Sequence, residues 1–148
     1  MRTIAVVSCI VVSLVGCSRG DSAPIVFEDV EFSDGLATLR VEERGDVECV
    51  VFEDEGLEWC GEPIARVDRP SVIGVSGAGS GNVFQWVAVG VAPLGVNVVE
   101  VSIDDARIST SLTPGPEYSI WIVRLANVHE SVEPAAPYSP DVRVRVAS

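Results

Sequence analysis

The feature that most constrains this chain is a two-residue alternation of apolar and polar side chains, which recurs from residue 25 onward. Segment 98–104, VVEVSID, has valine or isoleucine at 99, 101 and 103 and mostly polar residues between them. Segment 142–146, VRVRV, repeats the pattern. Alternation with this period is typical of a β-strand with one face buried and the other in water. Because Gly, Pro, Asp and Asn turns separate such runs about every 8–12 residues, the sequence predicts an all-β fold.

Two longer segments, 83–92 and 119–128, lack the alternation because they are apolar on both faces. Such runs favour central strands that are covered on both sides, with Trp86 and Trp121 as core anchors. We therefore expect a two-sheet antiparallel sandwich over residues 25–148, immunoglobulin-like in the loose sense, with about seven to nine strands. The spacing of Cys, Trp and Cys in true immunoglobulin domains is absent, so this expectation concerns architecture alone.

The N-terminal segment 1–16 has the pattern of an export signal. Arg2 supplies a positive start, and an apolar run follows from Ile4 to Val15. That run is too short to cross a hydrocarbon core of about 30 Å, which needs about 20 residues. A secretory signal peptide is therefore the favoured interpretation.

The end of that segment, Leu14-Val15-Gly16-Cys17, resembles the lipobox of bacterial lipoproteins. In that family the cysteine receives a diacylglyceryl group, and the signal is removed just before it. The resemblance implies a signal peptide at 1–16, lipidated Cys17 with a short tether at 17–24, and a domain at 25–148. It also implies that the protein is anchored to the extracytoplasmic face of a bacterial cell-envelope membrane. The alternative is an ordinary signal peptide with a stray cysteine.

The remaining cysteines predict one disulfide bond. Of the four cysteines in the chain, Cys9 lies in the signal and Cys17 in the lipobox, which leaves Cys49 and Cys60. An even pair in an exported chain is typical of a structural disulfide. A metal site or a reactive thiol would need further ligands or a shorter spacing. Trp59, beside Cys60, is a candidate to pack on the bond.

The charge balance argues against several functions. The formal net charge is −12, and every basic residue is Arg. An acidic surface repels nucleic acid and anionic headgroups, so we expect no nucleic-acid partner. The lack of Lys excludes the lysine-bearing phosphate loop, Schiff-base chemistry and the Ser-x-x-Lys motif.

Acidic residues are concentrated between 42 and 62, and four of them form a possible acidic binding patch: Glu53, Asp54, Glu55 and Glu58. Calcium prefers clustered carboxylates, but the spaced Asp loop that usually holds it is absent. The patch could instead meet another envelope protein with a basic surface. It could also be a solvated hairpin tip whose charges protect a sheet edge.

Catalytic templates find little support. His129 is the only histidine, and no Gly-x-Ser-x-Gly motif accompanies it. The Gly-rich stretch 74–82 precedes an apolar strand pattern and not a helix, so it predicts a hairpin loop rather than a phosphate site. The Pro-rich stretch 133–140 is expected to connect strands, with a recognition surface as the alternative. We therefore expect no catalytic residue, no metal and no cofactor.

A second resemblance covers residues 86–128. The run VAVGVAPLGVNVVEVSIDDARISTSLTPGPEYSIWIVRL is similar to a pattern in small uncharacterised exported β-proteins of high-GC Gram-positive bacteria. It implies no activity. The sequence thus predicts a lipid-anchored envelope protein, foremost a non-catalytic interaction or structural module. A small-ligand- or metal-binding lipoprotein is the alternative, and a small envelope hydrolase is less favoured.

Overall fold

The structure is a computed structural model that describes residues 23–32, 35–80, 83–128 and 140–148. In these residues the chain folds into β-strands joined by turns, with a single 3₁₀ turn, η1. The elements are β1 (Ile25–Phe32), β2 (Gly35–Arg44), β3 (Val47–Phe52), η1 (Glu53–Glu55), β4 (Leu57–Gly61), β5 (Ser71–Ser80), β6 (Val83–Ala92), β7 (Val98–Ile103), β8 (Ala106–Ser111), β9 (Thr113–Pro114), β10 (Ser119–Val128) and β11 (Val142–Val146). Among the described residues, no helix has the length and apolar character needed to cross a membrane.

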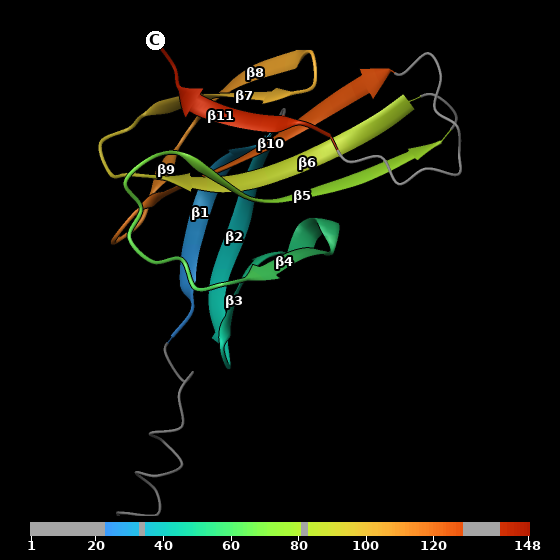
Figure 1. Ribbon diagram of the computed structural model, residues 1–148. Helices are drawn as coiled ribbons and strands as arrows, with labels where there is room; N and C mark the ends of the chain where they lie inside the picture. Colours follow the sequence, from blue (N-terminus) through green and yellow to red (C-terminus); the bar gives the residue numbers. More distant parts are fainter. Residues whose placement is uncertain (1–22, 33–34, 81–82, 129–139) are drawn as a thin grey trace, which may run out of the picture.

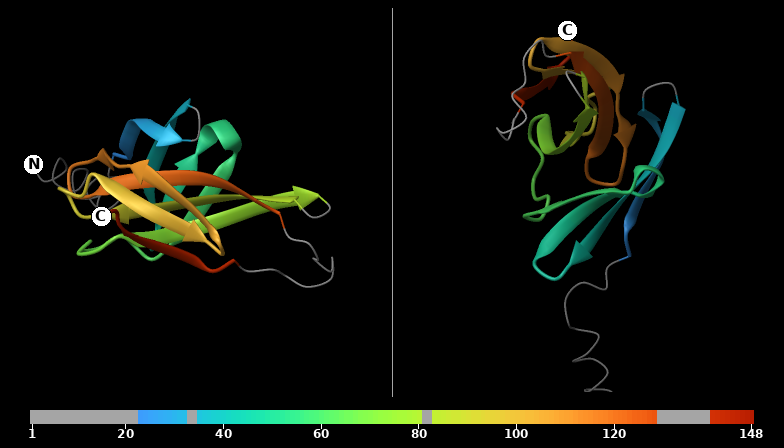
Figure 2. Two further views of the ribbon diagram at one scale, coloured as in Figure 1. Left: turned by 90° about the horizontal axis from the view of Figure 1, so that it is seen from above. Right: turned by 90° about the vertical axis from the view of Figure 1, so that its right-hand side faces the viewer.

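The strands form three antiparallel sheets. Sheet A has the order β1-β2-β3-β4, sheet B the order β5-β6-β10-β9, and sheet C the order β11-β7-β8. Sheet B lies between the other two, as Figure 1 and the right-hand view of Figure 2 show. The predicted all-β antiparallel sandwich is confirmed. The described residues contain 11 strands in three sheets, where about seven to nine strands in two sheets were expected.

The first hydrophobic core fills the space between sheets A and B. From sheet B it takes alternate residues of the two central strands, such as Val89 on β6 and Ile122 on β10. From sheet A it takes the inward side chains of every strand, including Phe27, Leu39 and Trp59. Each of these residues is at most 8% exposed. Sheet A is therefore packed against sheet B by one face only.

The second hydrophobic core fills the space between sheets B and C. It contains the residues of β6 and β10 that point away from the first core, including Trp86 and Trp121. Val99, Val101 and Ile103 of β7 face them, and all three are fully buried. Because successive side chains on a strand point to opposite faces, β6 and β10 contribute to both cores. The prediction that these two strands are covered on both sides, with Trp86 and Trp121 in the core, is confirmed.

Gly90 leaves room in sheet B for Trp121, the largest fully buried side chain among the described residues. It lies directly opposite Trp121 in the pairing of β6 with β10. A Cβ atom at Gly90 would come within 2.1 Å of the Ser71 carbonyl oxygen and 2.2 Å of Cζ2 of Trp121. Neither neighbour can move easily, since one is backbone and the other belongs to a fully buried indole. The glycine is thus required by close packing in the centre of the molecule.

We predict that Gly90→Ala lowers the free energy of unfolding by about 1–3 kcal/mol, because overpacking a core displaces side chains and backbone. Denaturant unfolding of both proteins would measure the difference. Gly61→Ala is the matched control, since a Cβ at that strand position meets nothing within 4 Å. Equal stability of Gly90→Ala and Gly61→Ala would contradict the packing described here.

Candidate functional site

Several residues singled out by the sequence lie outside the described residues. They are Cys17 with its lipobox, His129, most of the Pro-rich stretch, and part of the Gly-rich stretch at 81–82. The predictions for lipidation, for the role of His129 and for a recognition loop therefore stay predictions. The disulfide and the acidic binding patch lie inside the described region, on sheet A and its hairpin tip.

The disulfide between Cys49 and Cys60 is present, as predicted. The two residues face each other across β3 and β4, with Cα atoms 4.1 Å apart. The bond lies on the outer face of sheet A, because the neighbouring residues Val50 and Trp59 point into the first core. The suggestion that Trp59 packs on the disulfide is therefore wrong. Adjacent residues on a strand occupy opposite faces, so sequence neighbours could not share this contact.

Removing both cysteines by Cys49→Ala and Cys60→Ala should lower the free energy of unfolding by about 3 kcal/mol. The reason is that the bond closes an 11-residue separation in the unfolded chain. Chemical unfolding of the double variant and the oxidised wild type would measure this difference. Two reactive thiols in the folded domain, apart from Cys17, would contradict the assignment of the bond.

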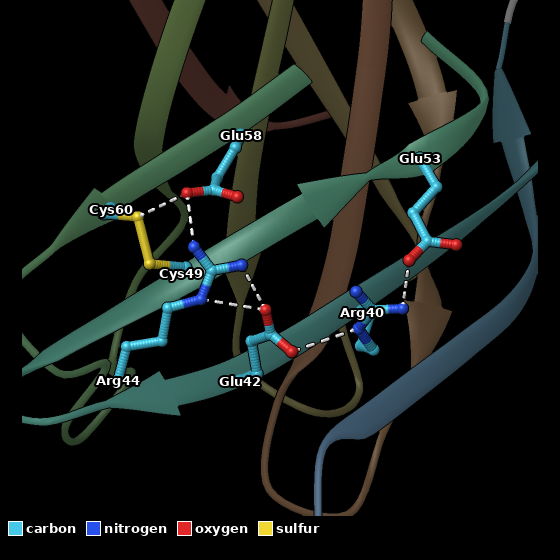
Figure 3. A network of polar contacts seen from close by, with 7 residues as sticks. All are labelled: Arg40, Glu42, Arg44, Cys49, Glu53, Glu58 and Cys60. Atoms are coloured by element: carbon cyan, nitrogen blue, oxygen red, sulfur yellow. Dashed lines mark hydrogen bonds and ion pairs between the residues drawn. A yellow bond between two sulfur atoms is a disulfide. The ribbon is translucent and has the colours of Figure 1, made fainter. Parts of the chain in front are cut away.

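Three residues of the acidic binding patch are each paired with an arginine. Glu53 and Glu55 lie in η1, and Glu58 lies on β4. Their partners come from other strands, as Figure 3 shows for two of them. Glu53 pairs with Arg40, Glu55 with Arg124 at 2.5 Å, and Glu58 with Arg44 at 2.6 Å. Among the described residues Asp54 alone of the four has no ion pair.

Arg40 and Arg44 extend these pairs into a network across the outer face of sheet A (Figure 3). Arg40 joins Glu53 to Glu42, and Arg44 joins Glu42 to Glu58. The hydrogen bond from Arg44, aided by the charge of Arg40, lowers the pKa of Glu42. The arginines therefore neutralise most of the charge that the acidic binding patch would present to a basic partner.

A metal ion has no complete site in this network. The described residues bring Cys49, Glu58 and Cys60 together, with candidate ligand atoms within 4.8 Å of one another. Both sulfur atoms are joined in the disulfide, and metals bind the thiolate. A carboxylate oxygen of Glu58 lies 3.3 Å from Sγ of Cys60. The disulfide sulfur carries no proton, so this is a contact and not a hydrogen bond.

Glu48 is a second polar feature of sheet A, and sequence reasoning missed it. It lies on β3 at an inward position, two residues before Val50, and is half-buried. Burial raises the pKa of the Glu48 carboxyl, although a backbone hydrogen bond from Ile64 opposes this effect. Burial of the Tyr118 hydroxyl, together with the nearby charges of Glu48 and Glu117, raises the pKa of Tyr118. Because side chains alternate along a strand, residue 48 lies on the same face as Val50 and Phe52, and this pattern could have predicted the inward position of Glu48.

We predict that Glu48→Gln raises the melting temperature at pH 7. A raised pKa means that the folded state favours the protonated carboxyl over the ionised carboxylate. The stability gained from the protonated carboxyl is complete below the unfolded pKa and is lost as pH rises through the folded pKa. The amide removes this penalty and keeps an oxygen for the Ile64 hydrogen bond. Below the unfolded pKa of about 4.3, the difference should vanish. Exposed Glu62→Gln is the control, and equal effects of both changes at pH 7 would refute this prediction.

Sheet C carries a groove of about 350 Å³ on its outer face. Its lining comes from all three strands of the sheet: Glu100, Ser102, Arg107, Arg143, Val144 and Arg145. Two grooves on sheet A measure only about 80 and 100 Å³. Small-molecule sites usually enclose about 300–1,000 Å³, so of these three only the groove on sheet C has a fitting size. We call it the arginine groove.

The strand register arranges the arginine groove in two rows. Ser102 of β7 lies between Arg107 of β8 and Arg143 of β11. In the next row, Arg145 donates to one oxygen of Glu100 from both Nε and Nη2, at 2.9 and 2.6 Å. Arg143 pairs with Asp141 at 2.8 Å. Among the described residues Arg107 makes no ion pair.

These side chains are suited to binding rather than to proton transfer. An Arg guanidinium stays protonated, so it donates hydrogen bonds and accepts no proton. Ser102 has arginines on both sides in its row, and Glu100 is held by Arg145. Sequence reasoning placed Arg143 and Arg145 on the solvent-facing side of a strand and made no prediction for Arg107. No protein-family model matches the chain, and no curated protein or solved structure matches it significantly.

Proposed function

We propose that this protein is a lipid-anchored module of the bacterial cell envelope that binds a partner on the extracytoplasmic side without catalysing a reaction. The observation that carries the proposal is the arginine groove, a binding surface at the opposite side of the molecule from the start of the domain. β1 begins at the end of sheet A that lies farthest from sheet C, as two different views show (Figures 1 and 2). An anchor at Cys17 would therefore leave the groove facing away from the membrane.

The proposed anchor and tether are compatible with this orientation. Two or more acyl chains on one cysteine suffice for stable attachment, whereas a single chain is marginal. The tether from Ser18 to Pro24 spans about 25 Å at most when extended, at roughly 3.5 Å per residue. The domain would stand close to the membrane with sheet A nearer to it and sheet C farther away.

The side chains on both outer faces support binding over catalysis. On sheet A, the carboxylates of Glu42, Glu53 and Glu58 are held by arginines. On sheet C, the groove combines three arginines with a serine and one paired glutamate. A small-ligand-binding lipoprotein is the second candidate function, and the volume of the arginine groove, about 350 Å³, supports it.

The anchor is tested by Cys17→Ala in the producing cell. We expect this variant to leave the membrane fraction or to accumulate with its signal uncut, because it lacks the acylated sulfur. Fractionation followed by detection with an antibody would measure its distribution. Cys9→Ala is the matched control, since it changes a cysteine in the discarded signal. Unchanged membrane association and processing of Cys17→Ala would overturn the anchor.

A further inference from the structure

The arginine groove is lined mainly by positive charges, whereas the chain as a whole is negatively charged. The sequence has 22 acidic and 10 basic residues. The groove lining nevertheless contains three arginines and a single acid, Glu100. A polyanion would be repelled by the acidic molecule as a whole. An isolated anionic group experiences mainly the local charge, because salt screens charges beyond about 8 Å at physiological ionic strength.

The three arginines differ in how firmly they are held. Arg145 is 66% exposed, but it makes two hydrogen bonds to Glu100, whose side chain is only 26% exposed. Arg143 pairs with Asp141, but their side chains are 78% and 62% exposed, and ion pairs this exposed are weak. Arg107 makes no ion pair with any described residue. An incoming anion could therefore bind Arg107 at once and draw Arg143 away from Asp141.

The register places these two arginines on either side of one serine. Arg107, Ser102 and Arg143 form one row across β8, β7 and β11. Adjacent strands lie about 4.8 Å apart, so the Cα atoms of the two arginines are roughly 10 Å apart. Ser102 points outward with them, because Val101 and Ile103 on either side are buried in the second core. Because all three side chains lie on the outer face of sheet C, they can reach one anion held above Ser102.

We propose that this row binds the phosphate group of a small, singly phosphorylated organic ligand. Guanidinium groups bind phosphate and carboxylate in a two-pronged manner. Two guanidinium charges and a hydroxyl suit a phosphate group with a charge near −2 better than a carboxylate with a charge of −1. The rest of the groove, beside Val144 and the Arg145–Glu100 pair, accommodates the organic part. This inference rests on the proposed function, since it takes the groove as the binding face.

The test measures binding to the full chain, purified in non-ionic detergent, by isothermal titration calorimetry at low ionic strength. Glycerol 1-phosphate is the probe; inorganic phosphate, acetate, glycerol and vesicles with anionic lipid are the comparisons. We expect glycerol 1-phosphate to bind more tightly than inorganic phosphate, and acetate and glycerol to bind weakly or not at all. Arg107→Gln and Arg143→Gln should each weaken binding about tenfold or more, because each removes charged hydrogen bonds.

Arg40→Gln is the matched control, because it removes the same charge from sheet A, on the other side of sheet B. It should bind as the wild type does, and thermal melts would verify that all variants are folded. Equal binding by wild type and the folded Arg107→Gln/Arg143→Gln double variant would overturn the proposal. So would acetate binding as tightly as glycerol 1-phosphate, or binding to vesicles alone.

The outcome is separable from that of the anchor. Cys17→Ala should keep its affinity for glycerol 1-phosphate, since the groove lies on sheet C and needs no lipid. If the protein binds the probe but is not attached to the membrane, the proposed phosphate site is supported and the proposed lipid anchor is overturned. If it is attached to the membrane but binds none of the probes, the anchor is supported and the phosphate site is overturned.

Discussion

Burial of both faces of β6 and β10 is the constraint on which the rest of the structure depends. These strands are apolar on both sides, so one covering sheet would leave a row of large side chains in water. Sheets A and C each cover one face, and the fully buried Trp121 joins sheet B to sheet C. The close approach of its indole to Gly90 shows how little spare volume this layer has. Volume changes in such an interior are costly, since proteins pack as densely as organic crystals.

Filling both cores with the inward side chains leaves the polar chemistry to two outer faces on opposite sides of the molecule. On sheet A, Arg40 and Arg44 already form ion pairs with carboxylates of the same face. On sheet C, the arginines outnumber the acids in their groove. The two faces therefore differ in what they can offer a partner, although both belong to antiparallel sheets. The cation that sheet C offers most freely is Arg107, on the edge strand β8.

The acidic stretch 42–62 has more basic partners in the folded protein than its sequence contains. In sequence it contains one basic residue, Arg44. In the folded protein, Arg40 reaches it along β2 and Arg124 reaches it from β10, where the guanidinium also lies 4.9 Å from the ring centre of Phe32. Partners 13 or more residues away in sequence are brought close only by strand pairing and sheet packing. A local charge count could not anticipate this neutralisation.

The sequence by itself determined the all-β class, the two strands covered on both sides and the disulfide. Each of these follows from local information: the period of apolar residues, the lack of a wet face in 83–92 and 119–128, and an even pair of cysteines. The prediction was wrong about the Gly-rich stretch 74–82, which was expected as a hairpin loop but belongs to strand β5 as far as Ser80. Only the tertiary structure decided that sheet A and sheet C cover opposite faces of sheet B, that Trp59 points away from the disulfide, and that Arg107 and Arg143 flank Ser102. The physical reason is that alternation fixes which face a side chain takes, whereas register and sheet order fix its neighbours, and these come from distant parts of the chain.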